Sequence, residues 1–226
     1  MADFLYSIIP NVMDKPDLLW KAFIQTLQMV GIAGCISLVI GIPLGVLLFT
    51  TKTGGVLQSR PVHLILSKFC DIFRSIPFIL LAVLLLGLSR LIMGTAIGVK
   101  GAIIPLLFGT IPYLARQVEG ALAEVPDGLI EAAQAMGCSP WEIVYRVYLK
   151  ESIPGIARGV TITLISLVNF TAIAGTIGAG GLGNFAIMYG HGKNQPDISV
   201  VVILIIVVLV SIIQAIGSTV ARKTTH

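Results

Sequence analysis

The chain has 226 residues, of which 56% are hydrophobic and only 12% are charged. A soluble domain carries about a quarter charged residues, so this chain has too few polar side chains to cover a water-soluble globule. The composition therefore indicates an integral membrane protein, and the formal charge of +4, which includes no run of basic residues, does not indicate nucleic-acid binding.

Five apolar stretches are long enough to cross a bilayer as helices, which takes about 20 residues. We expect spans at residues 23–49, 76–93 with an amphipathic lead-in from 61, 96–115, 156–177 and 198–220. The stretches lack the alternation of strands, and a helix satisfies its backbone polar groups within lipid. The predicted fold is an all-α integral membrane protein, with residues 1–226 forming one transmembrane domain.

Basic residues in the loops predict the orientation, because they are retained on the cytoplasmic side of a membrane. With the N-terminus outside and the C-terminus inside, the outer side carries Lys15, Lys21, Arg90, Lys100 and Lys193. The inner side then carries Lys52, Arg60, Lys68, Arg74, Arg116, Arg146, Lys150, Arg158, Arg222 and Lys223. The opposite orientation would reverse this excess, so we predict that the N-terminus is outside.

Charged groups are missing from the middle of every predicted span. Proton-driven carriers usually need a buried carboxylate or His for the coupling ion, so this pattern argues against a self-powered transporter. Lys68, Asp71 and Arg74, at the start of the second span, are expected to pair at i,i+3 spacing. Cysteines and histidines lack metal-ligand spacing and no P-loop is present, so no metal, cofactor or ATPase site is predicted in this chain.

The fourth span is the most polar of the five. Thr and Ser hydroxyls can bond back to their own helix, so packing is one explanation of this polarity, and a lining of the substrate path is the other. The glycine-rich segment 178–183 follows it and is expected to form a flexible outer turn or a gate. It satisfies G-x-G-x-x-G, but a dinucleotide site needs a preceding strand. The candidate path and gate residues are Ser166, Asn169, Thr171, Gly180, Gly181 and Gly183.

The longest polar segment, residues 119–155, lies between the third and fourth spans and is predicted to be helical and cytosolic. Asp127 is expected to cap a first helix, and Gly137 to follow its end in the left-handed conformation. Spacing of i, i+3, i+4 and i+7 predicts one apolar face, formed by Leu129, Ala132, Ala133 and Met136.

A second helix is predicted to begin after Ser139 and to run to Pro154. Ser139 is the expected cap, Pro140 takes the first helical position, and Glu142 completes a capping box. The side chains available for burial are Trp141, Val144, Tyr145, Tyr148 and Leu149. The helix pair can lie against the chain's own underside, or it can dock into a partner.

The sequence Glu131-Ala132-Ala133 followed by Gly137 resembles the EAA---G motif in permease subunits of bacterial ATP-binding-cassette importers. In that family the motif forms the coupling helix, which inserts into the ATPase subunit. Residues 74–79 (RSIPFI), 161–165 (TITLI) and 178–183 (GAGGLG) are similar to methionine-uptake permeases, so the resemblance covers about residues 20–220. Lys150 follows Leu149 where the family often has proline, which leaves the end of the coupling segment open.

The resemblance implies a multi-pass protein of the bacterial inner membrane that forms the path for methionine and is not itself an enzyme. It implies a second copy of the chain, two ATPase subunits that bind ATP and Mg, an external substrate-binding protein and surrounding membrane lipid. The implied coupling residues are Glu131, Ala132, Ala133, Met136 and Gly137. The alternatives are a permease for another small amino acid or osmolyte, and a secondary transporter or channel working alone.

Overall fold

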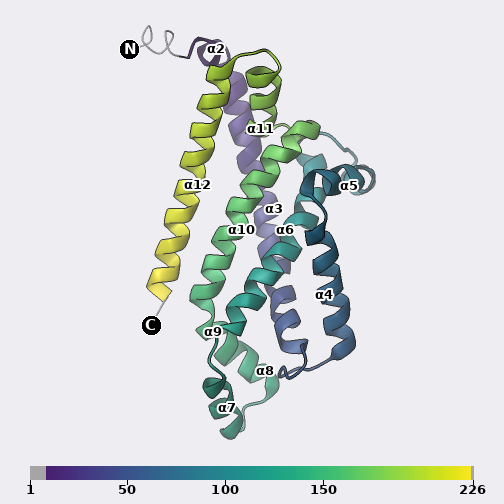
Figure 1. Cartoon of the computed structure of the whole chain (residues 1–226), viewed down its shortest axis with the longest axis vertical. Helices are drawn as coiled ribbons and strands as arrows, with labels where there is room; N and C mark the ends of the chain where they lie inside the picture. Colours follow the sequence, from purple (N-terminus) through teal and green to yellow (C-terminus); the bar gives the residue numbers. More distant parts are fainter. Residues whose placement is uncertain (1–8, 225–226) are drawn as a thin grey trace. The chain divides into compact units, whose positions relative to one another are not determined.

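The computed structural model describes residues 9–224, and every regular element in this range is a helix (Figure 1). The long helices are α3 (Pro16–Thr51), α4 (Arg60–Ser75), α5 (Phe78–Met93), α6 (Gly98–Ala123), α10 (Ile153–Ala174) and α12 (Pro196–Thr224). The short helices are α2 (Pro10–Met13), α7 (Asp127–Ala135), α8 (Pro140–Glu142), α9 (Leu149–Glu151) and α11 (Gly181–Phe185). Segments of π-helix occupy Ile143–Tyr148, Gly175–Ala179 and Ala186–His191.

Four helices in the described part of the chain are long and apolar enough to cross a membrane. They are α3, α6, α12 and the stretch Ile153–Ala179, which joins α10 to the π-helical segment after it. A fifth crossing results if the bent pair α4 and α5 is counted as one span. The prediction of an all-α membrane fold is therefore confirmed, while the predicted orientation of the termini stays a prediction.

The second predicted span is separated from its lead-in by a break before Pro77. Ile76 is extended, with φ −84° and ψ 125°, since a proline ring excludes the helical conformation from the residue before it. The helix that follows, α5, has 16 residues, which at 1.5 Å per residue is about 24 Å. This is shorter than a hydrocarbon core of about 30 Å. The predicted span over 76–93 corresponds to α5, which begins at Phe78, and its amphipathic lead-in from 61 forms a helix of its own, α4.

The chain divides into two compact units, each assembled from three separate segments. The first unit takes the described residues up to Cys35, together with Pro77–Gly109 and Leu164–Ile212. In its core the ring of Phe78 stacks on that of Phe170, with centroids 4.5 Å apart. The other buried members of this cluster are Met29, Ala33, Ala82, Ala102, Leu106, Leu167, Ala174 and Ala179.

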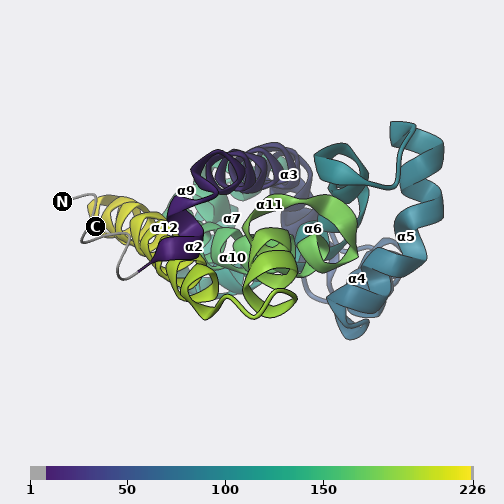
Figure 2. The same ribbon diagram turned by 90° about the horizontal axis from the view of Figure 1, so that it is seen from above.

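Helix α2, also in the first unit, is tied to the first turn of α12 (Figures 1 and 2). The backbone N–H and the side-chain amide of Asn11 donate to the two carboxylate oxygens of Asp197, each over 3.0 Å. Val12 and Ile198 are buried in one cluster beside this pair. The hydrogen bonds and the shared cluster hold the start of α12 in place.

The second unit comprises Ile36–Ile76, Thr110–Thr163 and the described part of Ile213–His226, and it carries the loop with α7 and α8. Two of its helices, α3 and α6, approach closely at Gly45, because glycine has no side chain. A Cβ atom on Gly45 would lie 2.5 Å from the carbonyl oxygen of Ala115 and 2.6 Å from Cβ of Val118. Contact of this kind between small residues is a common way for membrane helices to pack.

Arg116 links α4 to α6 within the second unit. Its two terminal nitrogens donate to Asp71 over 2.7 Å and to Glu119 over 2.6 Å. Asp71 was expected to pair with Lys68 and Arg74 on its own helix, and this expectation is corrected. The planar guanidinium carries several N–H donors in a fixed fork, so Arg116 binds Asp71 of the facing helix and Glu119 of its own helix at once.

Candidate coupling loop and substrate path

The loop of the second unit turns a corner after α7. Gly137 has φ +79°, a conformation that costs a residue with a side chain about 1–2 kcal/mol. Its N–H donates to the carbonyl of Gln134 over 2.9 Å, and the N–H of Cys138 donates to that of Ala133 over 3.1 Å. These two bonds form a Schellman motif, which satisfies the last carbonyls of the helix. The predicted left-handed glycine is confirmed, but Asp127 is the first helical residue and Pro126 the cap.

The next helix starts with the predicted capping box. The N–H of Glu142 donates to Oγ of Ser139 over 3.4 Å, and the N–H of Ser139 donates back to the Glu142 carboxylate over 3.0 Å. The bond from the Ser139 backbone, together with that from its hydroxyl, holds the pKa of the Glu142 carboxyl below its usual value. The helix ends at Glu151 rather than at Pro154, which instead lies in the first turn of α10, where proline is tolerated.

One side of the loop packs on the second unit's own core. Ile130 and Ala133 are buried there, 7% and 2% exposed, in the same cluster as Ile143 and Tyr148. The ring of Tyr148 meets that of Phe49 edge to face at 5.0 Å, and its burial raises the pKa of the phenol. Ala133 was expected on the face that presses into a partner. That expectation is corrected, because its side chain faces its own chain.

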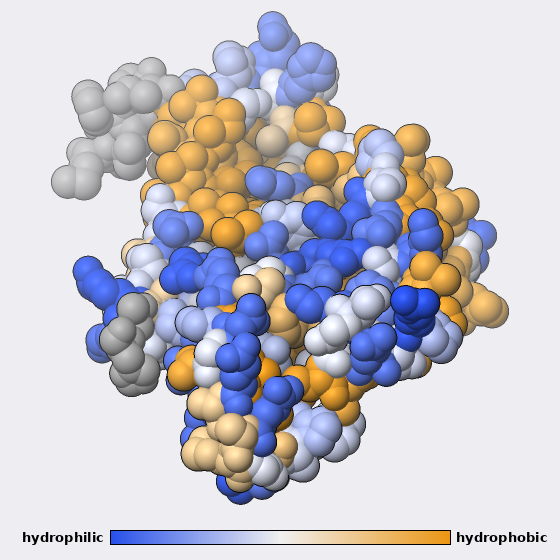
Figure 3. All heavy atoms as spheres, turned by 60° about the horizontal axis from the view of Figure 1, so that its bottom comes forward, coloured by the Kyte–Doolittle hydropathy of each residue, from blue (hydrophilic) through white to orange (hydrophobic). Residues whose placement is uncertain are grey.

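The opposite side of the loop is uncovered. Met136 is 77% exposed, Trp141 is 60% exposed and Tyr145 is 51% exposed. Five exposed side chains define what we call the outer face of the loop: Leu129, Ala132, Met136, Trp141 and Tyr145. Of the side chains available for burial, Trp141 and Tyr145 are therefore not covered by this chain, whereas Val144 and Tyr148 are buried in it. Figure 3 shows hydrophobic spheres among hydrophilic ones over this end of the second unit.

The loop also carries exposed charged groups close in sequence to the outer face. Glu131, the first residue of the EAA sequence, is exposed and lies between Leu129 and Ala132 in the chain. Glu142 and Arg146 form an exposed ion pair at 3.6 Å, one turn apart. An exposed pair of this kind contributes little to stability. Exposed apolar and charged side chains therefore occur together on the loop, as they do in many protein interfaces.

The polar residues of α10 fall into two groups. The hydroxyl of Thr171 donates to the carbonyl of Val168 over 2.7 Å, and Thr171 is 2% exposed. A buried hydroxyl that bonds its own helix serves packing, so Thr171 is placed away from any open surface. Asn169 is exposed and Ser166 is half-buried, three residues apart on the same helix. These two remain the candidates for a path along this helix.

The glycine turn after α10 is anchored to α3 within the first unit. The N–H of Gly181 donates to the side-chain oxygen of Gln25, and the N–H of Leu182 donates to the hydroxyl of Thr26, both over 2.9 Å. A Cβ atom on Gly181 would lie 2.8 Å from the Thr26 hydroxyl, and one on Gly183 would strike the backbone of Ala172. The expected flexible turn is thus a packed one, in which Gly180 and Gly181 also adopt positive φ. Among residues 9–224 no cluster of His, Cys, Asp or Glu could hold a metal ion.

Comparison with known proteins gives consistent matches. Residues 37–225 match the family described as binding-protein-dependent transport system inner membrane component. The chain is 48% identical to a probable D-methionine transport system permease protein of Vibrio cholerae, over 93% of both chains. It is 43% identical to a methionine import system permease protein of Bacillus subtilis, over 92% of this chain and 93% of that one. A solved methionine ABC transporter in inward-facing conformations matches with 42% identity and a TM-score of 0.90, over 94% and 99% of the two chains.

Proposed function

Because the chain belongs to the family of binding-protein-dependent transport system inner membrane components, we propose that it is the permease subunit of an ATP-driven methionine importer. The match to the methionine permeases over nearly the whole of both chains carries this proposal. The chain is a multi-pass protein of the inner membrane, and ATP hydrolysis belongs to a partner ATPase. That partner is where ATP and Mg would bind.

The outer face of the loop is the surface that we assign to the ATPase. Exposed Met136, Trp141 and Tyr145 present an apolar area that water covers poorly, and the small side chain of Ala132 leaves room for close approach. Exposed aromatic and Met side chains are typical of the centres of protein interfaces. Glu131 and the Glu142–Arg146 pair would lie at the rim, where charge selects the partner more than it adds affinity.

The loop is built to transmit movement as a rigid block. The Schellman turn at Gly137 and the capping box at Ser139 fix the angle between α7 and α8, and the buried side of the loop fixes both to the second unit. Since the loop joins the end of α6 to the start of α10, a push on its outer face moves these two helix ends. The coupling role of Gly137 is thus to set the angle, and that of Ala133 to seat α7 on its own core.

The importer assembles around two copies of this chain, two ATPase subunits and an external protein that delivers methionine. A single chain offers four or five spans, which are few for enclosing a path. A two-fold pair places the path between the copies. Asn169 and Ser166 are the side chains of α10 that we assign to this path, while Gly180, Gly181 and Gly183 hold its outer end in place. The excess of basic residues supports a cytoplasmic position for the loop and the C-terminus.

Co-purification and uptake test the proposal together. The tagged chain, extracted from the membrane in mild detergent, should bring down a separate nucleotide-binding subunit in a ratio of one to one. Cells that express both subunits should accumulate labelled methionine in an ATP-dependent manner, and unlabelled methionine should compete better than histidine or proline. A chain that transports alone, after reconstitution without any ATPase, would be a secondary transporter or channel instead.

A further inference from the structure

A groove lies between the start of α10 and the end of α12, in the second unit. Its volume is about 680 Å³, which is within the range of about 300–1,000 Å³ that small-molecule sites have. Five polar or charged residues line its walls: Arg158 and Thr161 from α10, and Gln214, Ser218 and Arg222 from α12. The two helices meet at Gly217, because a Cβ atom there would strike the side chain of Thr161. The groove is therefore an opening beside a close helix contact.

The end of α12 has a polar side and an apolar side. Gln214, Ser218 and Arg222 are exposed and four residues apart, so they follow one side of the helix along the groove. Ile212 and Ile216 are exposed on the other side. Gln214 lies within the apolar stretch 198–220, where a polar side chain that faces lipid is costly. The polar side of α12 is therefore not a lipid-facing surface.

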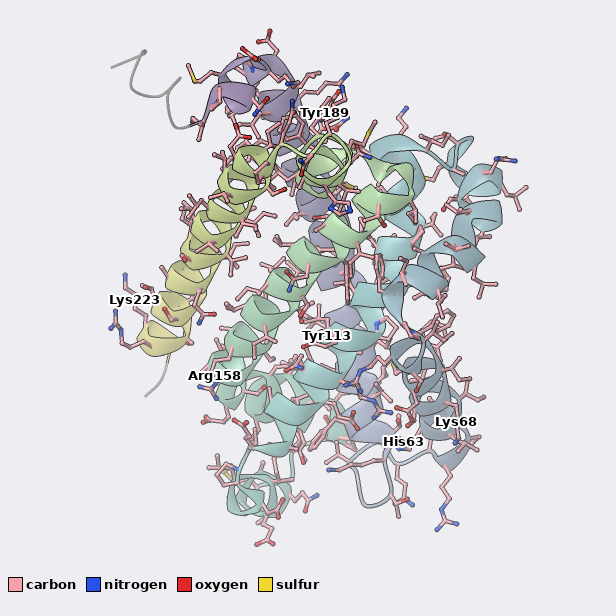
Figure 4. All side chains as sticks on the ribbon, turned by 45° about the horizontal axis from the view of Figure 1, so that its top comes forward. His63, Lys68, Tyr113, Arg158, Tyr189 and Lys223 are labelled. Carbon is pink, nitrogen blue, oxygen red and sulfur yellow. The ribbon has the colours of Figure 1, made fainter. Side chains whose placement is uncertain are left out.

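The α10 wall belongs to the helix face that we assign to the substrate path. Four residues recur at i, i+4, i+8 and i+11 and therefore share this face: Arg158, Ile162, Ser166 and Asn169. Figure 4 shows Arg158 near the start of α10 and Lys223 at the end of α12. The groove thus adjoins the same face of α10 as the path residues, close to the start of the helix.

The walls of the groove offer donors for a carboxylate and acceptors for an ammonium group. Arg222 is exposed and forms no ion pair with any residue between 9 and 224. Arg158 pairs with Glu124 at 3.1 Å, but both side chains are more than half exposed, so the pair contributes little and a ligand can replace it. The hydroxyls of Thr161 and Ser218 donate to carbonyls of their own helices, over 2.7 and 3.1 Å. Their oxygen atoms are therefore left as acceptors.

A zwitterionic amino acid with an apolar side chain matches these groups. Guanidinium groups bind a carboxylate through paired hydrogen bonds, and the hydroxyl oxygen of Ser218 and the amide oxygen of Gln214 can accept from an ammonium group. Ile162, on the α10 wall, is 44% exposed and offers an apolar contact for the side chain. A phosphate group would use the guanidinium groups but would leave the acceptors without a donor.

We propose that this groove is the exit of the substrate path, and that Arg158 and Arg222 bind the carboxylate of the departing amino acid there. The inference rests on the proposed function for two points, namely that the chain imports methionine and that the end of α12 faces the cytoplasm. Arg158 exchanges its partner Glu124 for the substrate carboxylate, and Arg222 binds the same carboxylate from the opposite wall.

Single cysteines in a cysteine-free background test the site in the permease–ATPase complex. Ser218→Cys places a thiol in the groove, and Ile216→Cys is the matched control on the other side of α12. An uncharged, water-soluble maleimide should modify Ser218→Cys faster than Ile216→Cys, because the groove admits water. Excess methionine should slow the reaction of Ser218→Cys alone. Methionine methyl ester, which lacks the carboxylate, and inorganic phosphate should protect this thiol poorly.

Arg222→Gln, added to Ser218→Cys, tests the role of the guanidinium group. It should raise the methionine concentration needed for half-protection about tenfold to a hundredfold, which is the contribution expected of a hydrogen bond between charged groups. Arg60→Gln is the matched control, because it removes an exposed basic residue at the start of α4 and should leave the protection unchanged. Each variant is compared with and without methionine, so a change in the reactivity of the thiol itself cancels.

Several outcomes would overturn the proposal. Equal reaction rates for Ser218→Cys and Ile216→Cys would mean that the groove is closed to water, and a disulfide between two copies through Ser218→Cys would mean that a second copy covers it. Equal protection by the methyl ester or by phosphate would exclude a site for the amino-acid carboxylate. If Ser218→Cys does not assemble, Gln214→Cys, one turn earlier on the same side, gives the same readout.

Uptake of labelled methionine by the cysteine-free complex separates the two hypotheses. A complex that transports methionine but shows no protection at Ser218→Cys would overturn the exit site alone. A complex that binds its ATPase but does not transport methionine would contradict the proposed function instead.

Discussion

Trp141 offers the sharpest test of the outer face of the loop. It is 60% exposed, and an aromatic side chain buries about 150–250 Å² when it is fully enclosed, so docking can remove roughly 90–150 Å² of it from water. At about 25 cal/mol per Å², this burial stabilises the complex by about 2–4 kcal/mol, which is an upper bound. Trp141→Ala should therefore weaken ATPase binding by roughly 30-fold to several hundredfold, without unfolding the loop.

The chain supplies its own control, because it has two tryptophans. Trp20 is 64% exposed and lies near the start of α3, in the first unit. Trp20→Ala removes the same side chain at the same exposure and should leave ATPase binding unchanged. Binding can be titrated by fluorescence in a Trp20→Phe background, where Trp141 alone should shift to shorter wavelength as the ATPase docks. Equal affinities for Trp141→Ala and Trp20→Ala would refute the assignment of this face.

Further predictions concern the interior of the loop and the orientation of the chain. Ala133→Asp should place an unpaired charge in the buried cluster, at a cost of several kcal/mol, so that limited proteolysis cuts the loop while the spans still insert; an uncut loop would contradict this. Gly137→Val should strain the left-handed turn by about 1–2 kcal/mol and lower coupled uptake more than ATPase binding. Because the pKa of Glu142 is lowered, the capping bonds of its carboxylate stabilise α8 fully above the ordinary Glu range, and this stabilisation is lost as pH falls through the lowered pKa. Glu142→Gln should therefore speed hydrogen exchange of α8 at neutral pH. In this variant, the further rise of the exchange rate in acid should be absent. In a cysteine-free background, an impermeant thiol reagent should label a cysteine at Lys193 but not one at Lys150 in intact cells, and the reverse pattern would invert the orientation.

Features that depend on local chemistry could be predicted from the sequence. The left-handed turn needs a residue without a side chain, so Gly137 indicated it directly. The capping box needs only Ser139 and Glu142 three residues apart, and both bonds are present. The all-α membrane fold followed from the length of the apolar stretches. The break at Ile76 also has a local cause, because a proline restricts the conformation of the residue before it.

The buried side of α7 could not be predicted, because two apolar sets share the helix. Leu129 and Met136 lie on one side, while Ile130 and Ala133 lie on another, and both sets have helical spacing. Periodicity finds an apolar face but cannot choose between two. The choice depends on Phe49, at the end of a helix about 80 residues earlier in the chain, which packs with this cluster. The partner of Arg116 was missed for the same reason, since Asp71 reaches it from another helix.

In the proposed complex the two faces of the loop have separate tasks, and this separation would explain its composition. A docking surface that also formed the loop's own core would unfold whenever the ATPase left, because the apolar side chains would lose their cover. Here Ile130, Ala133 and Tyr148 keep the loop folded by burial within one chain, so Met136 and Trp141 can stay exposed between docking events. A loop that is folded before docking loses less conformational entropy on binding than one that folds on its partner. It can therefore pass on the displacement of the ATPase as a rigid movement of the ends of α6 and α10.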